Sequence, residues 1–277
     1  MTLLPPLPAS VSESLVTAGE VNLRVLRAGG GRPLLLIPGW TCPADLFVHQ
    51  LTGLADRFDV IAVDPRGHGG SDKPVDGNTF AQRGRDIAAL IDALELDDVV
   101  LLGWSYGVLD ALSYLEQHGT ERITALVLAD ETPKVPADPS DPTEWGEAEL
   151  THDGIIALLR AIIDDREGFW TGYASYMIGT EDGTENPDVA RIVELGLQTP
   201  QHVAVATAAD GFASDYAATA TGVSAEIPTL FLAREDWADD ARRWTSVNLP
   251  TATDGTIPTH MGFVVDPDGF NAQVAAI

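Results

Sequence analysis

Ser105 is the serine whose surroundings best suit chemistry, because it lies between two glycines in the stretch Gly103-Trp104-Ser105-Tyr106-Gly107. An apolar run at 99–102 precedes this stretch and a helical pattern follows it, so the sequence predicts a sharp strand-to-helix turn at the serine. Such a turn strains the backbone and lifts the serine hydroxyl clear of a sheet. It also brings backbone N–H groups and the positive end of a helix to the place where an oxyanion develops. Ser105 is therefore the candidate nucleophile.

A serine nucleophile needs a base, and His260 is the best-placed histidine. It lies in "IPTHMGFVVDPDGF", between the last β-like segment and the last helical pattern. In a sheet of parallel strands this loop lies at the carboxyl edge, beside the turn at Ser105. The other histidines lie on helical patterns, in a helical insertion or in a glycine-rich loop: His49, His118, His152, His202 and His68. We therefore expect His260 to accept the serine proton.

Strand-like and helix-like segments alternate along most of the chain. Runs that are apolar on both faces, which is typical of strands buried in a parallel sheet, occur in "ITALVLADETP" and "IPTLFLARED" and at 34–37, 60–63 and 99–102. Helical patterns occur at 44–57, 79–94, 106–119, 239–247 and 268–277. This alternation predicts an α/β fold with a doubly wound, mostly parallel sheet.

The alternation stops between residues 135 and 226. This segment opens with the Pro/Asp-rich "KVPADPSDPTEWGE" and continues with amphipathic stretches such as "DGIIALLRAIIDDREGFWTGYASYMIG". We therefore predict a helical cap at 135–226, inserted into a core domain that consists of residues 1–134 and 227–277.

Taken together, several segments resemble the α/β-hydrolase fold superfamily: "LLLIPGW", "VIAVDPRGHGGSD", "GWSYG", "ALVLADETP", "IPTLFLA" and "PTHMGFVVDPDGF". The resemblance covers nearly the full length and implies a mostly parallel sheet of about eight strands flanked by helices. By analogy with the serine-nucleophile, esterase-like branch, the backbone N–H groups of Trp40 and Tyr106 would form the oxyanion hole. The resemblance implies neither a cofactor nor a metal ion.

The acid that orients the histidine is open between two aspartates. The usual acid of the family follows the strand that corresponds to "PTLFLA", where this chain has Asp236. A second position, used by some branches, is the end of the preceding strand, where Asp130 stands in "LVLADETP". Asp236 stands one residue early in the family pattern, so we rank Asp130 first and keep Asp236 as the alternative.

A Ser-His-Asp triad with an oxyanion hole suits acyl transfer. We therefore expect a serine hydrolase, similar to carboxylesterases, that cleaves esters of small to medium apolar substrates through an acyl-enzyme. The serine argues against haloalkane dehalogenases and soluble epoxide hydrolases, which resemble this chain but attack with an aspartate. Aromatic residues near the motifs and in the cap are expected to line the substrate pocket: Trp40, Trp104, Tyr106, Trp145, Trp170 and Tyr173.

A different enzyme class is also open. "IPGWTCPADLF", "RGHGGS" and "YLEQHGTERITALVLAD" resemble the cofactor-free dioxygenases that open quinolone rings. That branch keeps its acid at the Asp130 position and uses a His-Asp dyad to deprotonate a hydroxy-ketone, which then reacts with O₂. Its further histidines are missing here, because Thr41-Cys42-Pro43 and Tyr106 stand at those positions. A lyase or a non-hydrolysing receptor with an intact triad is a third alternative.

The charge balance excludes several classes of partner. The 277 residues include 42 Asp and Glu against 16 Lys and Arg, which gives a formal net charge of −26. Such a surface repels nucleic acid and anionic membranes, so we expect a small-molecule substrate. Only Lys73 and Lys134 are lysines. The composition fits either an acidic mesophilic enzyme or a halophilic protein, and the near-absence of lysine favours the halophilic interpretation.

Compartment and redox chemistry follow from three further features. The N-terminal "MTLLPPLPAS" lacks the basic start of a signal peptide. No apolar run approaches the ~20 residues that span a bilayer. Cys42 is the only cysteine, so an internal disulfide and a cysteine-based zinc site are excluded. We therefore expect a cytoplasmic protein.

We predict that the melting temperature rises as the salt concentration increases from about 0.1 M to molar values. At ~1 M salt the Debye length falls to about 3 Å, which screens the repulsion among the acidic side chains. Thermal unfolding in a series of NaCl concentrations measures the effect. A melting temperature that stays flat or falls across the series would contradict the halophilic interpretation.

Overall fold

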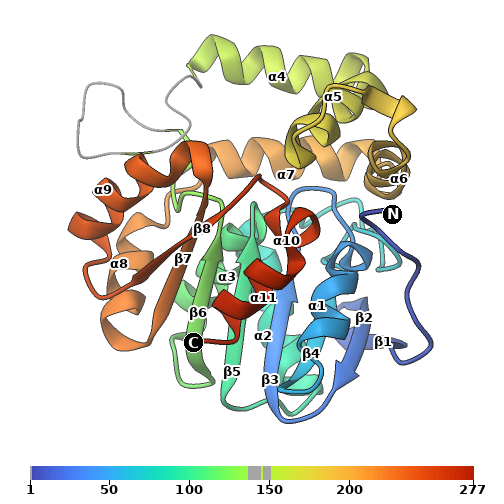
Figure 1. The fold of residues 1–277 in the computed structure, drawn as a ribbon. Helices are drawn as coiled ribbons and strands as arrows, with labels where there is room; N and C mark the ends of the chain where they lie inside the picture. Colours follow the sequence, from blue (N-terminus) through green and yellow to red (C-terminus); the bar gives the residue numbers. More distant parts are fainter. Residues whose placement is uncertain (1, 137–144, 146–150) are drawn as a thin grey trace.

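The centre of the molecule is one eight-stranded sheet (Figure 1). The structure is a computed structural model, and it describes residues 2–136, 145 and 151–277. The strand order is β1-β2-β4-β3-β5-β6-β7-β8, with β1–β2 and β2–β4 antiparallel and all other neighbours parallel. The bounds are Ser12–Ala18 (β1), Val21–Gly29 (β2), Arg32–Ile37 (β3), Phe58–Val63 (β4), Val99–Trp104 (β5), Ile123–Ala129 (β6), Thr229–Arg234 (β7) and Thr253–Ile257 (β8). The predicted fold class is confirmed.

The strands in the middle of the sheet are buried on both faces. Every residue of β4, β5 and β7 is buried, and β3 is buried from Leu34 onward. Strands covered by helices on both sides are rich in Val, Ile and Leu, which is why the runs at 34–37, 60–63 and 99–102 identified β3, β4 and β5. The edge strands β1 and β8 are mostly exposed and carry more polar residues.

Helices cover both faces of the sheet (Figure 1). The helices α1, α10 and α11 pack together on one face, and α2 packs against α3 on the other. Their bounds are Val48–Gly53 (α1), Gly262–Val265 (α10), Pro267–Val274 (α11), Phe80–Ala93 (α2) and Gly107–His118 (α3). Another helix, α9 (Ala238–Asn248), lies beside β7 and β8. The predicted helix at 44–57 is divided into a 3-10 turn, η1 (Ala44–Phe47), and the short α1.

Four helices, which we call the upper helices, lie above one end of the strands (Figure 1). They are α4 (His152–Asp164), α5 (Arg166–Ile178), α6 (Pro187–Gly196) and α7 (Gln201–Ala213). Three of these helices have a polar N-cap residue whose side chain accepts a hydrogen bond from a backbone N–H of the first turn. Thr151 caps α4, Asp165 caps α5 and Asn186 caps α6. These caps fix where the three helices begin.

The last helix of the predicted cap segment, α8 (Ala217–Glu226), packs beside α3 of the core. Hydrogen bonds between Thr219 and Glu116 and between Thr120 and Glu226 connect its two ends to α3 and to the loop after it. Residues 137–144 and 146–150 of the same segment lie outside the described residues, and the predicted cap boundaries stay a prediction. Within the described ranges, no helix is long and apolar enough to cross a membrane.

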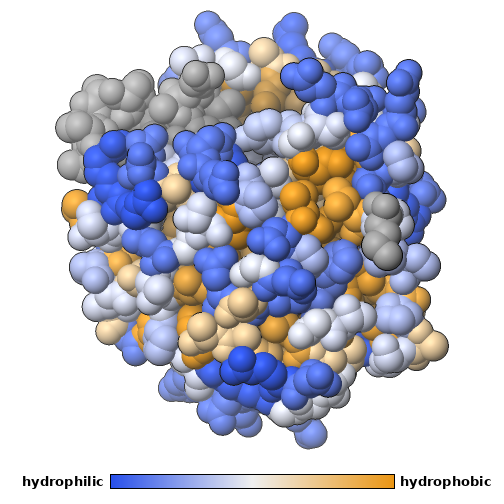
Figure 2. All heavy atoms as spheres, in the orientation of Figure 1, coloured by the Kyte–Doolittle hydropathy of each residue, from blue (hydrophilic) through white to orange (hydrophobic). Residues whose placement is uncertain are grey.

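Hydrophilic side chains cover much of the face that Figure 2 shows. Several acidic side chains extend into solvent, and those of Asp92, Asp97 and Asp239 are 73%, 76% and 96% exposed. A single exposed charge contributes little to stability, because water screens it. The excess of negative charge therefore acts collectively, through repulsion across the surface.

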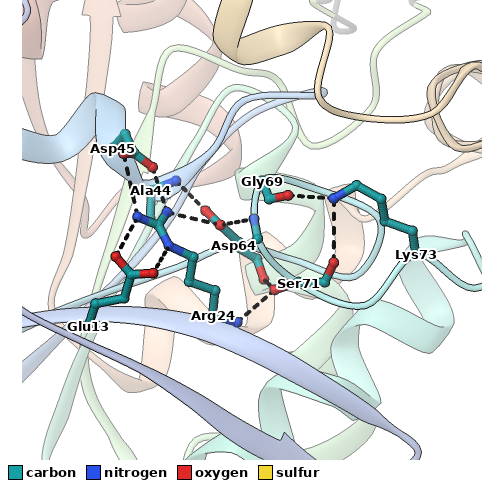
Figure 3. A network of polar contacts seen from close by, with 9 residues as sticks. Glu13, Arg24, Ala44, Asp45, Asp64, Gly69, Ser71 and Lys73 are labelled. Carbon is teal, nitrogen blue, oxygen red and sulfur yellow. Dashed lines mark hydrogen bonds and ion pairs between the residues drawn. The ribbon is translucent and has the colours of Figure 1, made fainter.

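Asp64, which directly follows β4, ties two loops together (Figure 3). Its carboxylate accepts the backbone N–H of Ala44 at 2.6 Å and that of Gly70 at 2.7 Å. Arg24 approaches Asp64 to 3.2 Å and Asp45 to 2.6 Å. Asp64 is fully buried, so its charge needs these donors. The loop after β3 and the glycine-rich loop after β4 are thereby held in a fixed relative position.

His68 forms a second link between the same loops. Its Nε2 accepts the backbone N–H of Thr41 at 3.0 Å, and its Nδ1 donates to the carbonyl oxygen of Arg66 at 2.9 Å. Both bonds together require the neutral ring with its proton on Nδ1. Thr41 has a φ of 54°, which residues other than glycine seldom adopt, so the bond holds a strained turn in place. Burial, and after it the charge of Arg83, lowers the pKa of His68 well below its usual value.

We predict that His68 lowers the free energy of unfolding as the pH falls below about 6.5. In that range the unfolded chain binds a proton at this histidine and the folded protein does not, so stability falls by up to about 1.4 kcal/mol per pH unit. Urea unfolding at several pH values measures the slope. The variant His68→Gln keeps all the carboxylates but lacks this titration, so its slope between about pH 6.5 and 5 should be shallower. Equal slopes in the two proteins would show that His68 is not held neutral.

Candidate active site

Ser105 lies between the last residue of β5 and the first residue of α3, at the turn that the sequence predicts. Its φ is 53°, and its N–H donates to the carbonyl oxygen of Ala129 at 2.8 Å. The turn is tight, because a Cβ on Gly103 would lie only 2.2 Å from the carbonyl oxygen of Gly107. Glycine is therefore required there, and the backbone strain at Ser105 is maintained by the surrounding chain.

His260 and Asp130 meet beside this turn. His260 Nδ1 lies 2.6 Å from Asp130 Oδ2, and both side chains are almost fully buried. The backbone of the histidine is fixed as well, because Trp104 Nε1 donates to the His260 carbonyl oxygen at 2.7 Å. A carboxylate that accepts from Nδ1–H leaves the lone pair of Nε2 available to take a proton.

Asp236, the alternative acid, lies elsewhere. Its side chain is 68% exposed, and it contacts Arg234 Nε at 3.1 Å. The described contacts of His260 Nδ1 include Asp130 and not Asp236. The geometry thus pairs His260 with Asp130, the aspartate that the sequence analysis ranked first.

The other ring nitrogen of His260, Nε2, faces α5. The Tyr173 hydroxyl lies 3.4 Å from it and donates when the histidine proton is on Nδ1. Among the described residues, no hydrogen bond joins Ser105 Oγ to His260. Such catalytic bonds are often long in the free enzyme and tighten when substrate binds.

The loop after β3 runs close to the serine. A Cβ on Gly39 would lie 2.7 Å from Ser105 Cβ, so glycine allows this approach. The next residue is Trp40, whose indole Nε1 donates to the carbonyl oxygen of Ala204 in α7 at 2.8 Å. The indole also stacks on Trp170 of α5, with ring centroids 5.4 Å apart. The predicted oxyanion loop is therefore anchored to the upper helices on one side and to His68 on the other.

A cavity of about 170 Å³ opens next to Ser105. Its lining residues come from the loop after β3, the Ser105 turn, the segment after β6 and the upper helices: Trp40, Ser105, Tyr106, Glu131, Val135, Leu158, Ile162, Phe169, Tyr173, Ala208 and Phe212. Most of these side chains are apolar or aromatic, as expected for a site that binds small organic molecules. Trp40, Tyr106 and Tyr173 thus lie where the sequence analysis expected them.

The structure puts three predicted pocket residues outside the lining of this cavity. Trp104 is fully buried and packs against His260 and Phe263, because the residue before Ser105 still belongs to a strand and points to the other face. Trp170 is fully buried and stacks on the Trp40 indole, so it supports a lining residue without lining the cavity itself. Trp145 packs against a separate aromatic group on the core: Phe231, Trp237 and Trp244.

Glu131 is the lining residue with a carboxyl group, and sequence reasoning missed it. It follows Asp130 directly, is 5% exposed, and accepts the backbone N–H of Thr132 at 2.9 Å. Asp130 lies just past the end of β6 with a φ of 53°, and at this turn Asp130 contacts His260 while Glu131 lines the cavity. The signal was present in "LADETP", where a second carboxylate stands next to the candidate acid.

Neither a reactive thiol nor a metal cluster is found in the described part of the chain. Burial raises the pKa of the Cys42 thiol, which disfavours the nucleophilic thiolate. The described residues contain no group of three or more His, Cys, Asp or Glu side chains that could hold a metal ion.

Comparisons with known proteins agree with this architecture. A sequence model of the alpha/beta hydrolase fold matches residues 32–155. The non-heme chloroperoxidase CPO-A1 of Kitasatospora aureofaciens is 34% identical over 143 residues, which are 51% of this chain and 50% of that protein. The 2-(acetamidomethylene)succinate hydrolase of Mesorhizobium japonicum is 33% identical over 129 residues, 47% of this chain and 46% of that protein. The chain thus matches about half the length of these two relatives.

The likeness in three dimensions extends further. The esterase EaEST of Exiguobacterium antarcticum superposes with a TM-score of 0.85 and 23% identity, covering 96% of this chain and 98% of that one. A match of this kind reports the fold rather than the reaction. Fold, sequence model and relatives agree: the chain has the alpha/beta hydrolase fold, and the proteins it is similar to are esterases, haloperoxidases and other hydrolases of that fold.

Proposed function

We propose that the protein is a serine hydrolase that cleaves carboxylic esters of small to medium apolar substrates through an acyl-enzyme. One observation carries this proposal: the cavity that opens on Ser105 is lined mainly by apolar and aromatic side chains, and the His260–Asp130 pair lies beside it. The alpha/beta hydrolase fold of the chain and its hydrolase-named relatives support it as well.

In this scheme Ser105 Oγ attacks the ester carbonyl carbon while His260 Nε2 takes the hydroxyl proton. The backbone N–H groups of Trp40 and Tyr106 stabilise the tetrahedral oxyanion. His260 then gives its proton to the leaving alcohol, and an acyl-Ser105 ester forms. Water, deprotonated by His260, attacks this ester, releases the acid and restores the serine. Asp130 keeps the proton of the neutral ring on Nδ1 and stabilises the imidazolium between the steps.

A second function has one observation in its favour. The histidine pairs with the aspartate at the end of β6, which is the position that the resemblance to cofactor-free dioxygenases implies. In that scheme His260 deprotonates a hydroxy-ketone, and Ser105 serves only as a hydrogen-bonding group.

Ester turnover in the presence and absence of O₂ decides between the two functions. We expect p-nitrophenyl esters with short to medium acyl chains to be hydrolysed at the same rate in both conditions, because acyl transfer consumes no oxygen. Stopped-flow traces at high enzyme concentration should show a burst wherever deacylation is slow. Ser105→Ala should abolish the burst, steady-state turnover and labelling by a fluorophosphonate.

The opposite result is equally specific. Consumption of a 3-hydroxy-4-quinolone that depends on O₂ and survives Ser105→Ala, with no ester turnover in the wild type, would favour the dioxygenase. Fluorophosphonate labelling that persists in Ser105→Ala would move the nucleophile to another residue.

The two candidate acids can be separated by amidation. Asp130→Asn should lower kcat by about 10⁴-fold, because an amide no longer stabilises the imidazolium or enforces the correct tautomer. Asp236→Asn should have little effect, since its side chain is 68% exposed and contacts Arg234. Steady-state kinetics on both variants, with circular dichroism to confirm folding, tests the assignment. Small losses of similar size in the two variants would exclude both aspartates as the triad acid.

A further inference from the structure

Asp130 binds a cationic partner in addition to the His260 ring. Arg234, the last residue of β7, donates its backbone N–H to Asp130 Oδ1 at 2.7 Å and its Nη1 to Asp130 Oδ2 at 2.9 Å. The Oδ2 atom is the same oxygen that lies 2.6 Å from His260 Nδ1. Both side chains of this ion pair are buried, with Asp130 fully enclosed and Arg234 7% exposed. The triad carboxylate is thus shared between a histidine and a permanent cation.

The contacts on the far side of Arg234 reach the upper helices. Its guanidinium carbon lies 3.2 Å from the ring centroid of Trp237 and 5.6 Å from that of Tyr176 on α5. Tyr176 stacks on Tyr173, with ring centroids 6.2 Å apart. The Tyr173 hydroxyl returns to His260 Nε2 at 3.4 Å. A closed ring of contacts therefore joins five residues: Asp130, Arg234, Tyr176, Tyr173 and His260.

Asp236 does not neutralise Arg234 to the same degree as Asp130 does. The Asp236 carboxylate is 68% exposed, so water screens its charge. Its contact with Arg234 Nε, at 3.1 Å, lacks the geometry of a hydrogen bond. The buried positive charge of Arg234 therefore acts mainly on Asp130 and, across the shared oxygen, on His260.

A cation at this position has a definite effect on a triad. It holds Asp130 Oδ2 toward His260 Nδ1, which fixes the ring orientation. It also offsets part of the negative charge that stabilises an imidazolium, so protonation of the ring becomes less favourable. The titratable or charged groups that face His260 and its ring of contacts are Asp130 and Arg234 on the strand ends, Tyr173 and Tyr176 on α5, and Asp236 after β7.

We propose that Arg234 is a positioning residue for the triad: it orients Asp130 toward His260 and places a buried positive charge next to the carboxylate that faces the base. This inference rests on the proposed function, in which His260 must be neutral to accept the serine proton. Because the charge of Arg234 opposes that of an imidazolium, removing it should change the acid limb of the pH–rate profile.

The test compares the pH dependence of kcat/KM in three variants. In Arg234→Gln the acid limb should move about one pH unit upward, because the imidazolium forms more easily without the neighbouring cation. In Arg234→Lys the charge is kept and the paired donors are lost, so the limb should stay within about 0.3 pH unit while kcat falls. Arg243→Gln on α9, where the arginine side chain is 69% exposed, changes the net charge equally and should leave the limb in place.

Labelling by a fluorophosphonate provides the same profile without an ester substrate. A protein that is labelled at Ser105 but cleaves no ester contradicts the proposed function alone, and its labelling profiles still test Arg234. An acid limb in folded Arg234→Gln that coincides with the wild type would overturn the inference. If Arg234→Gln does not fold, Arg234→Lys carries the test, and a shift of a full pH unit in that variant would overturn it.

Discussion

Three backbone hydrogen-bond ladders, which join four parallel strands, bring the candidate catalytic residues together. Leu36 of β3 pairs with Leu102 of β5, Trp104 of β5 with Ala129 of β6, and Ala129 with Leu232 of β7. The ladders continue one residue past the strands, because the N–H of Ser105 donates to Ala129 and the N–H of Asp130 donates to Leu232. Strand ends that are hydrogen-bonded in this way cannot drift apart. The serine, the aspartate and Arg234 are therefore neighbours before any side chain forms a contact.

Sequence reasoning reached the parts of the site that depend on local chain geometry. Ser105 was identifiable because a turn with φ of 53° needs close-packed glycines around it, and those glycines are visible in the sequence. The central strands were identifiable because burial on both faces leaves long apolar runs. The choice between Asp130 and Asp236 was different in kind. Both follow adjacent strands of one sheet, and the distance from each carboxylate to His260 depends on side-chain direction in three dimensions.

The aromatic residues and α8 illustrate the same limit. Trp104 adjoins Ser105 in the chain, but the alternation of side chains along β5 turns it away from the cavity. Glu131 adjoins Asp130, and the turn at Asp130, whose φ is 53°, places it at the cavity. The sequence of α8, AATATGVSAE, consists mostly of small residues and has no distinct apolar face, so it does not tell a helix on the core from one above it. Apolar patterns in the sequence therefore predicted the helices and strands. Which neighbouring element each face packs against became known only from the three-dimensional structure.

Charge is distributed unevenly between the surface and the interior. Carboxylates dominate the composition, yet several of the scarce cations lie inside, where Arg66, Arg83 and Arg234 are only 5%, 2% and 6% exposed. Each of them pairs with a buried aspartate. Salt screens exposed charges far more than buried ones. The interior pairs, including the one beside His260, therefore keep their electrostatic field across ionic strengths that would change the repulsion at the surface.

Trp40 has a consequence for any attempt to exchange the upper helices between relatives. Its backbone belongs to the loop beside Ser105, while its indole is bonded to Ala204 and stacked on Trp170. A transplanted helical layer would have to bring a carbonyl acceptor and a flat aromatic platform to the same two places. Without them the indole would lose both contacts, and the loop beside Ser105 would lose its support. The upper helices and this loop would therefore have to be exchanged together.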